Sequence, residues 1–304
     1  MSVAVALAAF GAGCWLLIAS VERLVDVLQG WAAAAGLSGV LMGALVLGFD
    51  VESTAAGVAA TLDDLPGTAL GTSVGAAIFL VTAGLGIAGL VAPFAVRPPV
   101  ALLAAAGLAT AVCIALSVDG RLTRVDGAAL LASFVPLVAI VVVGRPAPPA
   151  SGGPRPARPD RLVVRVLAAL AGLAIGAELL VVGTGRVVAE LDLSETVFGL
   201  LVVAAAVSFE EVVLEALPAF RGVPELSVGN ALGTVVFLLT GSLGVIALAR
   251  PVAIPAAVTS YHLPALAITV LLAGGMLARG RLGRPEGAAL LAAYVVYAGL
   301  ALVA

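Results

Sequence analysis

Five acidic residues lie inside two otherwise apolar stretches of the sequence. Asp50 and Glu52 occupy the first stretch, and Glu210, Glu211 and Glu215 occupy the second. A charge at the centre of a membrane helix costs about 2.5 to 3.5 kcal/mol on insertion scales, so these side chains are expected to face a protein interior or an aqueous cavity. Glu211 and Glu215 are four residues apart and therefore share one face of a helix. Carboxylates this close together either hold protons or share a cation, and both are the chemistry of ion transport.

Two glycine-rich motifs follow the acidic stretches, GTSVG at residues 71–75 and GNALG at residues 229–233. Small residues allow helices to approach closely, and glycine also allows a helix to break and free its backbone carbonyl groups. The hydroxyl groups of Ser73 and Thr234 lie in or next to these motifs. Carboxylates, hydroxyl groups and carbonyl groups together would form the all-oxygen site that hard cations such as Ca²⁺ and Na⁺ prefer.

The elements that carry these residues are predicted to be membrane helices. Hydrophobic residues make up 62% of the 304 residues, charged residues make up 11%, and the mean hydropathy is +1.22, which excludes a water-soluble globular domain. Runs of about 20 apolar residues are long enough to span a bilayer. The sequence contains ten such runs, centred within residues 3–26, 37–61, 67–92, 99–118, 127–144, 163–187, 195–219, 226–249, 255–278 and 286–303. We therefore expect an all-α polytopic membrane protein.

The second half of the sequence repeats the first. The segment GFDVESTAAGVAATLDDLPGTALGTSVG from residue 48 aligns without a gap with AVSFEEVVLEALPAFRGVPELSVGNALG from residue 206, so that Glu52 matches Glu210. Because each copy has five spans, an odd number, the second copy must be inverted in the membrane. The predicted units are a first five-helix repeat at 1–144, a Pro/Gly/Arg-rich linker at 145–161 and a second, inverted five-helix repeat at 162–304. Inverted repeats are a recurring plan of secondary transporters, with the binding site where the repeats meet.

The arginines predict the orientation. With the N-terminus outside, the linker and most other arginines fall on the cytoplasmic side, as the positive-inside rule requires. We therefore expect a multi-pass protein of the cell membrane, inner or plasma, with both termini outside and a cytoplasmic linker.

Glu22 and Glu178 are expected at or near helix ends. The net charge of −3 and the absence of phosphate-loop or His/Cys metal spacings give no sign of nucleic-acid binding or of a resident cofactor.

Across essentially its whole length the chain resembles the cation/Ca²⁺ exchanger superfamily of sodium/calcium and proton/calcium exchangers. The resemblance is carried by GFDVES, GTSVGAAIF, VSFEEVV and RGVPELSVGNALGTVVF, together with the paired segments DGRLTRVDGAALL and RGRLGRPEGAALL. It implies ten helices in two inverted five-helix repeats, and antiport of Ca²⁺ against Na⁺ or H⁺. The family's motif glutamate corresponds to Glu211 in the second repeat and to Ser53 in the first, where Glu52 lies one place earlier. At neighbouring positions the sequence departs from the family pattern, since Phe49 and Val207 replace a hydroxyl residue.

These observations favour a secondary active cation antiporter, and not an enzyme, whose partners are inorganic cations and the lipid bilayer. The predicted ion-binding residues are carboxylates and hydroxyl groups of both repeats, with Glu52 and Glu211 as the metal ligands: Asp50, Glu52, Ser53, Ser73, Ser208, Glu210, Glu211 and Thr234. One alternative keeps transport but couples it to protons. Another is a membrane-embedded enzyme that uses Glu210 and Glu211 as acid and base on a lipophilic substrate.

Overall fold

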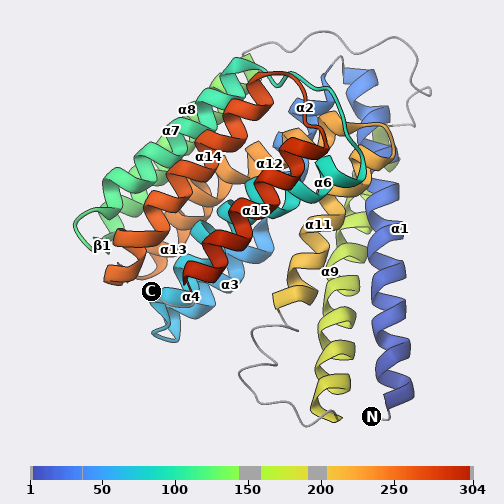
Figure 1. The fold of residues 1–304 in the computed structure, drawn as a ribbon, viewed down its shortest axis with the longest axis horizontal. Coiled ribbons are helices and arrows are strands. Elements are labelled where there is room, and N and C mark those ends of the chain that lie inside the picture. The colour runs from blue at the N-terminus through green and yellow to red at the C-terminus, as the bar shows by residue number, and fades with distance from the viewer. Residues whose placement is uncertain (1–2, 36, 144–158, 191–203, 302–304) are drawn as a thin grey trace.

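The computed structural model describes residues 3–35, 37–143, 159–190 and 204–301, and these are almost entirely helical (Figure 1). Segments labelled η are π-helical. The elements of the first repeat are α1 (Val3–Ala35), α2 (Gly39–Met42), η1 (Gly43–Leu47), α3 (Val51–Leu62), α4 (Pro66–Leu70), η2 (Gly71–Gly75), α5 (Ala76–Phe79), η3 (Leu80–Gly84), α6 (Leu85–Val91), α7 (Val100–Ser117), β1 (Arg121–Leu122) and α8 (Arg124–Val143).

The second repeat begins with α9 inside the predicted linker, because a proline at the first helical position suits a helix start. Its elements are α9 (Pro159–Glu190), α11 (Ala204–Phe220), α12 (Pro224–Val236), η5 (Phe237–Ser242), α13 (Leu243–Ala249), β2 (Val252–Ala253), η6 (Val258–His262), α14 (Leu263–Ala278) and α15 (Arg284–Ala301).

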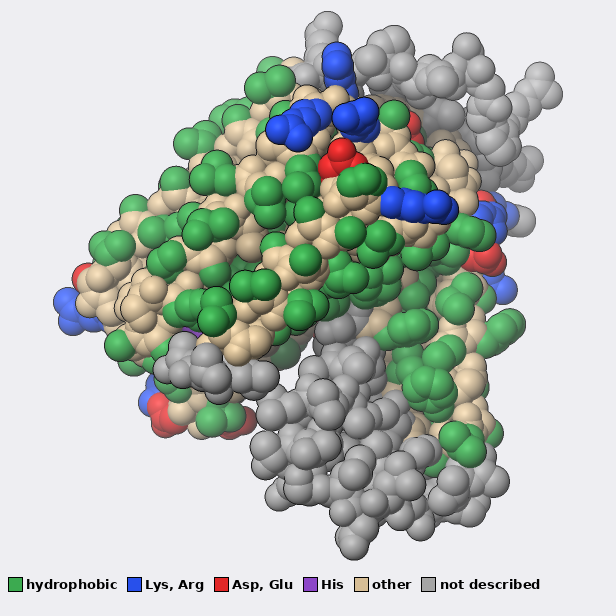
Figure 2. All heavy atoms as spheres, viewed as in Figure 1, with side chains coloured by type: hydrophobic (Ala, Val, Ile, Leu, Met, Phe, Trp, Pro, Cys, Tyr) green, Lys and Arg blue, Asp and Glu red, His purple; other side chains and the backbone are tan. Residues whose placement is uncertain are grey.

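Among the described residues, eight helical stretches are long and apolar enough to cross a membrane. They correspond to eight of the ten predicted spans. The predicted seventh span, 195–219, begins outside the described residues and continues as α11, and the tenth corresponds to α15. Hydrophobic side chains are spread over the face shown in Figure 2, whereas the basic side chains gather mainly toward its upper part and its sides. Val100 (80% exposed) and Leu271 (73%) are examples of this apolar exterior, which suits a bilayer and not water. The all-α polytopic membrane fold is therefore confirmed.

The inverted repeat is visible in two matching loop contacts at opposite ends of α14. Before α14, β1 pairs with β2 in antiparallel register, with Leu122 opposite Val252. After α14, Phe94 and Leu282 exchange two backbone hydrogen bonds of 3.0 and 2.9 Å. In the repeat alignment Phe94 matches Val252 and Leu122 matches Leu282, so the same contact is made twice with the roles of the repeats exchanged.

Close packing of glycines repeats in the same way. A Cβ atom on Gly86 would lie 3.0 Å from the carbonyl oxygen of Gly287, and one on Gly127 would lie 2.8 Å from that of Gly244. Gly86 matches Gly244 and Gly127 matches Gly287 in the repeat alignment. Each pair joins the third span of one repeat to the fifth span of the other, so the two repeats interlock.

The helices α1 and α9 form a pair on one side of the molecule (Figure 1). Glycines bring their backbones together: a Cβ atom on Gly13 would lie 2.8 Å from the carbonyl oxygen of Gly176. Leu17, Leu24 and Leu173 belong to an apolar cluster centred on this pair, while a separate cluster joins most of the buried residues of the other helices. The described residues thus form two hydrophobic clusters, one inside the main bundle and one where α1 and α9 pack on each other and on α11 and α12.

Candidate cation-binding site

The second span is broken between η1 and α3, at residues 48–50. Gly48 lies directly against α12, since a Cβ atom at this position would come 2.9 Å from the carbonyl carbon of Gly233 and 2.9 Å from the amide nitrogen of Thr234. Asp50 then caps the new helix: its Oδ1 accepts a hydrogen bond of 2.8 Å from the amide of Ser53. The break therefore brings a carboxylate and the N-terminus of α3 close to α12 of the other repeat.

The acidic residues of the second repeat that are predicted as ligands lie on α11. Glu210 and Glu211 are partly buried, and Oε2 of Glu211 is buried without a hydrogen-bond partner among the described residues. Glu211 interacts electrostatically with Glu210 on its own helix and with both Asp50 and Glu52 of the first repeat. Glu210 also interacts with Asp50 and Glu52. The four carboxylates predicted as ligands therefore come from both repeats and act on one another across the interface.

Glu52 differs from the other three because it is exposed, in the first turn of α3. This position suits a negative charge, since the free amide groups of a helix N-terminus carry partial positive charge. Besides Asp50, Glu52 interacts with Glu178 on α9. The predicted metal ligands are thus placed differently: Glu211 is partly buried in α11, whereas Glu52 lies at an accessible edge of the same group.

The predicted neutral ligands differ in their burial and in their hydrogen-bond partners. Ser73 is fully buried in η2, and its hydroxyl group has no partner among the described residues. Thr234 is buried next to Gly48, and its hydroxyl group lies 3.4 Å from Oδ1 of Asn230. Ser53 uses its backbone amide to bind Asp50. The side chain of Ser208 lies outside the described residues. Ser73 therefore presents an unsatisfied buried oxygen, which the sequence alone could not show.

The two glycine motifs also behave differently. In the second repeat, a Cβ atom on Gly229 or Gly233 would collide with the backbone of the η1 region, so the predicted close helix approach is confirmed there. In the first repeat, Gly71 and Gly75 have nothing within 4 Å among the described residues. The π-helical turn of η2 covers this first motif. Such turns leave carbonyl groups outside the regular helical pattern and are frequent at functional sites.

A carboxylate and hydroxyl donor set suits a hard cation. In the part of the chain that the structure describes, however, no three His, Cys, Asp or Glu side chains converge closely enough to hold a metal ion. Asp50 is engaged at the helix cap and Glu52 is exposed, so the acids surround a common region without closing a coordination shell. The predicted roles of Glu52 and Glu211 as metal ligands stay predictions.

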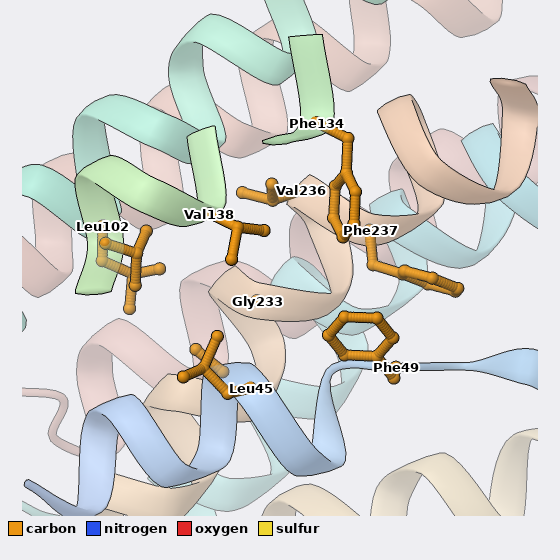
Figure 3. Close-up of a pocket in the computed structure, with 10 residues that line it drawn as sticks. Leu45, Phe49, Leu102, Phe134, Val138, Gly233, Val236 and Phe237 are labelled. Carbon is orange, nitrogen blue, oxygen red and sulfur yellow. The ribbon is translucent and has the colours of Figure 1, made fainter. Parts of the chain in front are cut away.

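A small apolar pocket lies next to the break (Figure 3). Its aromatic wall consists of Phe49, Phe134 and Phe237, with ring centroids 4.9 to 5.9 Å apart. The pocket has room for about one water molecule. It is therefore too narrow for the lipophilic substrate of the alternative enzyme hypothesis. Because Phe49 directly precedes Asp50, the aromatic cluster instead forms an apolar wall beside the acidic group.

The sequence interpretation misplaced two acidic residues. Glu22 and Glu178 were expected at or near helix ends, but both lie well inside the long helices α1 and α9. Glu22 binds Arg221 at 2.8 Å, and Glu178 interacts with Glu52. The sequence could have identified Glu178 as a candidate functional residue, because it is an acid within an apolar run. The sequence does not show which helix faces Glu178.

In the comparison with known proteins, one family model matches both halves of the chain. The family model described as sodium/calcium exchanger protein matches residues 5–143 and 161–303. CaxA of Alkalimonas amylolytica, a candidate antiporter, is 29% identical over 311 residues, covering 94% of this chain and 95% of CaxA. An uncharacterized membrane protein of Methanocaldococcus jannaschii is 26% identical over 241 residues, covering 76% of each chain.

Solved structures of the sodium-calcium exchanger NCX_Mj have the same fold. The structure soaked with 2.5 mM Na⁺ and 10 mM Sr²⁺ matches with a TM-score of 0.85 and 23% identity, over 98% of this chain and 99% of that one. The structure soaked without Na⁺ and Ca²⁺ matches with a TM-score of 0.86 and the same identity and coverage. The two five-helix repeats are therefore arranged as in NCX_Mj.

Proposed function

The chain belongs to the sodium/calcium exchanger protein family, and from this premise we propose that it exchanges Ca²⁺ for Na⁺ or H⁺ across the membrane by alternating access. The family and the antiporter relative support cation antiport as the general activity. The observation that carries the specific proposal is the electrostatic coupling of Asp50 and Glu52 in one repeat to Glu210 and Glu211 in the other. Such acids in a membrane interior are expected to serve an ion pathway.

Exchange follows from competition for these carboxylates. Without a counter-ion, several negative charges in a region of low polarity repel one another, so either protons or metal cations must occupy them. Ca²⁺ would bind Glu211, Glu210, Glu52 and Asp50, with neutral oxygens supplied by Ser53, Ser73, Ser208 and Thr234. Because Ca²⁺ and its competitor need the same oxygens, one must leave before the other binds. This mutual exclusion converts one ion gradient into another.

Alternating access would come from movement of the α1–α9 pair against the remaining bundle. In this movement of two bodies, the α1–α9 pair would change its apolar contacts with α11 and α12, through residues such as Val213 and Leu226, whereas the apolar cluster of the main bundle would keep its interior. Glu52 interacts with Glu178 on α9, so movement of α9 alters the surroundings of the site. The aromatic wall of Phe49, Phe134 and Phe237 stays on the bundle side.

We place the protein in the cell membrane with both termini outside, repeats at 1–144 and 162–304, and a cytoplasmic linker at 145–161. The arginine distribution of the sequence supports this orientation. The inorganic cations are cargo, and the proposal includes no resident cofactor.

Transport in proteoliposomes tests the function. The purified chain is reconstituted, and Ca²⁺ uptake is measured under an imposed Na⁺ gradient and, separately, under an imposed pH gradient. Wild type is expected to take up Ca²⁺ under at least one of the two. Glu211→Gln keeps the size of the side chain but removes its negative charge, so it is expected to weaken uptake by roughly tenfold or more.

Glu286→Gln is the matched control for charge removal. Glu286 lies in the first turn of α15 and accepts a hydrogen bond of 3.0 Å from the amide of Gly283. It is not one of the acids of the candidate cation-binding site. This variant is expected to transport like wild type. If neither gradient drives Ca²⁺ into wild-type vesicles, the proposed exchange is wrong.

A further inference from the structure

Glu215 is an acidic residue that the proposed cation site does not use. It lies on α11, one helical turn beyond Glu211, and its side chain is completely buried. Neither carboxyl oxygen has a hydrogen-bond partner among the described residues. The carboxyl group lies against Gly84 at the end of η3, where a Cβ atom would collide with Oε2 of Glu215. Glycine is therefore needed at position 84 to leave room for this acid.

A buried carboxyl group without partners is not a stable anion. Ionising an isolated, buried carboxyl group is very costly, and such groups take up a proton instead. A metal cation would need space and further oxygen ligands. The side chain has no accessible surface at all (0% exposed), whereas a proton needs no space beyond the O–H bond. The surroundings of Glu215 thus select a proton over a metal cation.

The charged groups near Glu215 are few. Its helix packs against α1, α6, α9, α12 and η3. The segments α6 and η3 carry no charged side chain. Among the side chains that the structure describes on α1, α9 and α12, the charged ones do not interact electrostatically with Glu215: Glu22, Arg23, Asp26, Arg165, Glu178 and Glu225. The one such interaction is with Glu211 on the same helix. Whatever changes the charge at Glu211 therefore acts directly on Glu215.

We propose that Glu215 is a proton-binding residue, separate from the cation site, that couples proton release to Ca²⁺ binding. This inference rests on the proposed exchange and names H⁺ as a coupling ion. When Ca²⁺ binds at Glu211, its positive charge favours the ionised form of Glu215, the O–H bond breaks and the proton leaves for the solvent. When Ca²⁺ leaves, the negative charge of Glu211 favours the neutral acid, and the carboxylate takes up a proton again. One proton is exchanged in each cycle.

Glu215→Gln tests the proposal because glutamine copies the size of the protonated acid but cannot release a proton. The full chain is reconstituted in proteoliposomes, and proton flux is followed with a pH-sensitive dye as Ca²⁺ is added. Removing a positioned proton-transfer group is expected to lower the Ca²⁺-driven proton flux by roughly 100-fold. Ca²⁺ binding, measured by calorimetry in detergent, is expected to persist. Glu215→Asp keeps an ionisable group and is expected to restore part of the flux.

Infrared spectroscopy gives a readout that does not depend on transport. At neutral pH the wild-type protein is expected to show the carbonyl stretch of neutral carboxylic acids, and Glu215→Gln is expected to lose the part of this band that comes from Glu215. Gly84→Ala, which leaves all acids in place but crowds Glu215, is expected to shift this band.

The outcomes separate this inference from the proposed function. If wild type transports Ca²⁺ but Glu215→Gln retains the full proton flux, or if no infrared band is lost, Glu215 is not the proton-binding residue and the exchange proposal stands. If wild type moves no Ca²⁺ under either gradient, exchange is wrong, and the infrared band alone decides whether Glu215 holds a proton. Size-exclusion profiles matching wild type exclude misfolding as the cause of a loss.

Discussion

At the residue scale, Asp50 has two roles that a single substitution would confuse. Its Oδ1 caps α3 by accepting the amide hydrogen of Ser53, and its charge acts on Glu210 and Glu211 across the repeat interface. Asp50 therefore combines a structural role at the break with an electrostatic role in the acidic group.

Asparagine and alanine at position 50 separate the two roles. Asparagine is as good an N-cap as aspartate but has no charge, whereas alanine loses both properties. We expect Asp50→Asn and Asp50→Ala to weaken Ca²⁺ binding alike, and Asp50→Ala alone to lower the free energy of unfolding, by about 1 kcal/mol. Ca²⁺ titration and thermal unfolding in detergent measure the two effects. Wild-type Ca²⁺ affinity in Asp50→Asn would exclude Asp50 as a ligand.

At the element scale, the broken second span and the glycines of α12 depend on each other. Gly229 and Gly233 allow η1 and α12 to touch through their backbones, and Gly48 allows the chain to turn away at the contact. The contact therefore sets the position of Asp50, at the break, relative to Glu211 on α11, the helix that packs beside α12. Together with the glycine contacts between the third and fifth spans, it brings the acids of the two repeats close to one another.

Alanine at Gly233 tests this contact. The added methyl group would meet the backbone of Ala44, so we expect Gly233→Ala to lower the free energy of unfolding by about 1 to 3 kcal/mol, the usual cost of overpacking. Ca²⁺ uptake should fall as well, because the acids of the two repeats move apart. Thermal unfolding and vesicle uptake are the measurements.

Gly75→Ala is the matched control, since Gly75 aligns with Gly233 in the first repeat but has nothing within 4 Å among the described residues. Replacing an open helical glycine by alanine gains up to about 1 kcal/mol. Equal destabilisation by both substitutions would show that the motifs do not differ in packing.

At the scale of the whole molecule, two arginines form ion pairs on different surfaces, one between the two bodies of the proposed movement and one inside the main bundle. Arg221, at the end of α11, binds Glu22 and Asp26 of α1 at 2.8 and 3.5 Å and so joins the two bodies. Arg250 binds Asp64 at 2.5 Å, and both lie at the ends of helices in the main bundle. Such partly exposed pairs stabilise a fold by at most about 1 kcal/mol. They are therefore useful mainly because they identify residues that lie close together on each of the two surfaces.

Chemical cross-linking converts this difference into a prediction. In a chain with Cys14 and Cys113 replaced by alanine, cysteines are introduced at Glu22 and Arg221 and joined by a short bifunctional thiol reagent. Because the proposed sliding would separate these positions, we expect Ca²⁺ uptake in vesicles to be lost while Ca²⁺ binding in detergent persists. The same cross-link between Asp64 and Arg250, within one body, should leave uptake intact. Uptake by the chain linked between α1 and α11 would show that these helices do not move apart.

The sequence by itself determined the membrane fold, the duplication and the types of residue at the site. These follow from composition, from the length of apolar runs and from self-similarity, which are local properties of the chain. The tertiary structure decided which of these residues act together. It placed Glu178 near Glu52, left Ser73 and Glu215 without hydrogen-bond partners among the described residues, and packed the glycines of α12, but not those of η2, against a neighbouring backbone. Contacts between distant segments depend on how helices rotate and cross, and the sequence pattern of a helix that is apolar on every face does not specify its rotation.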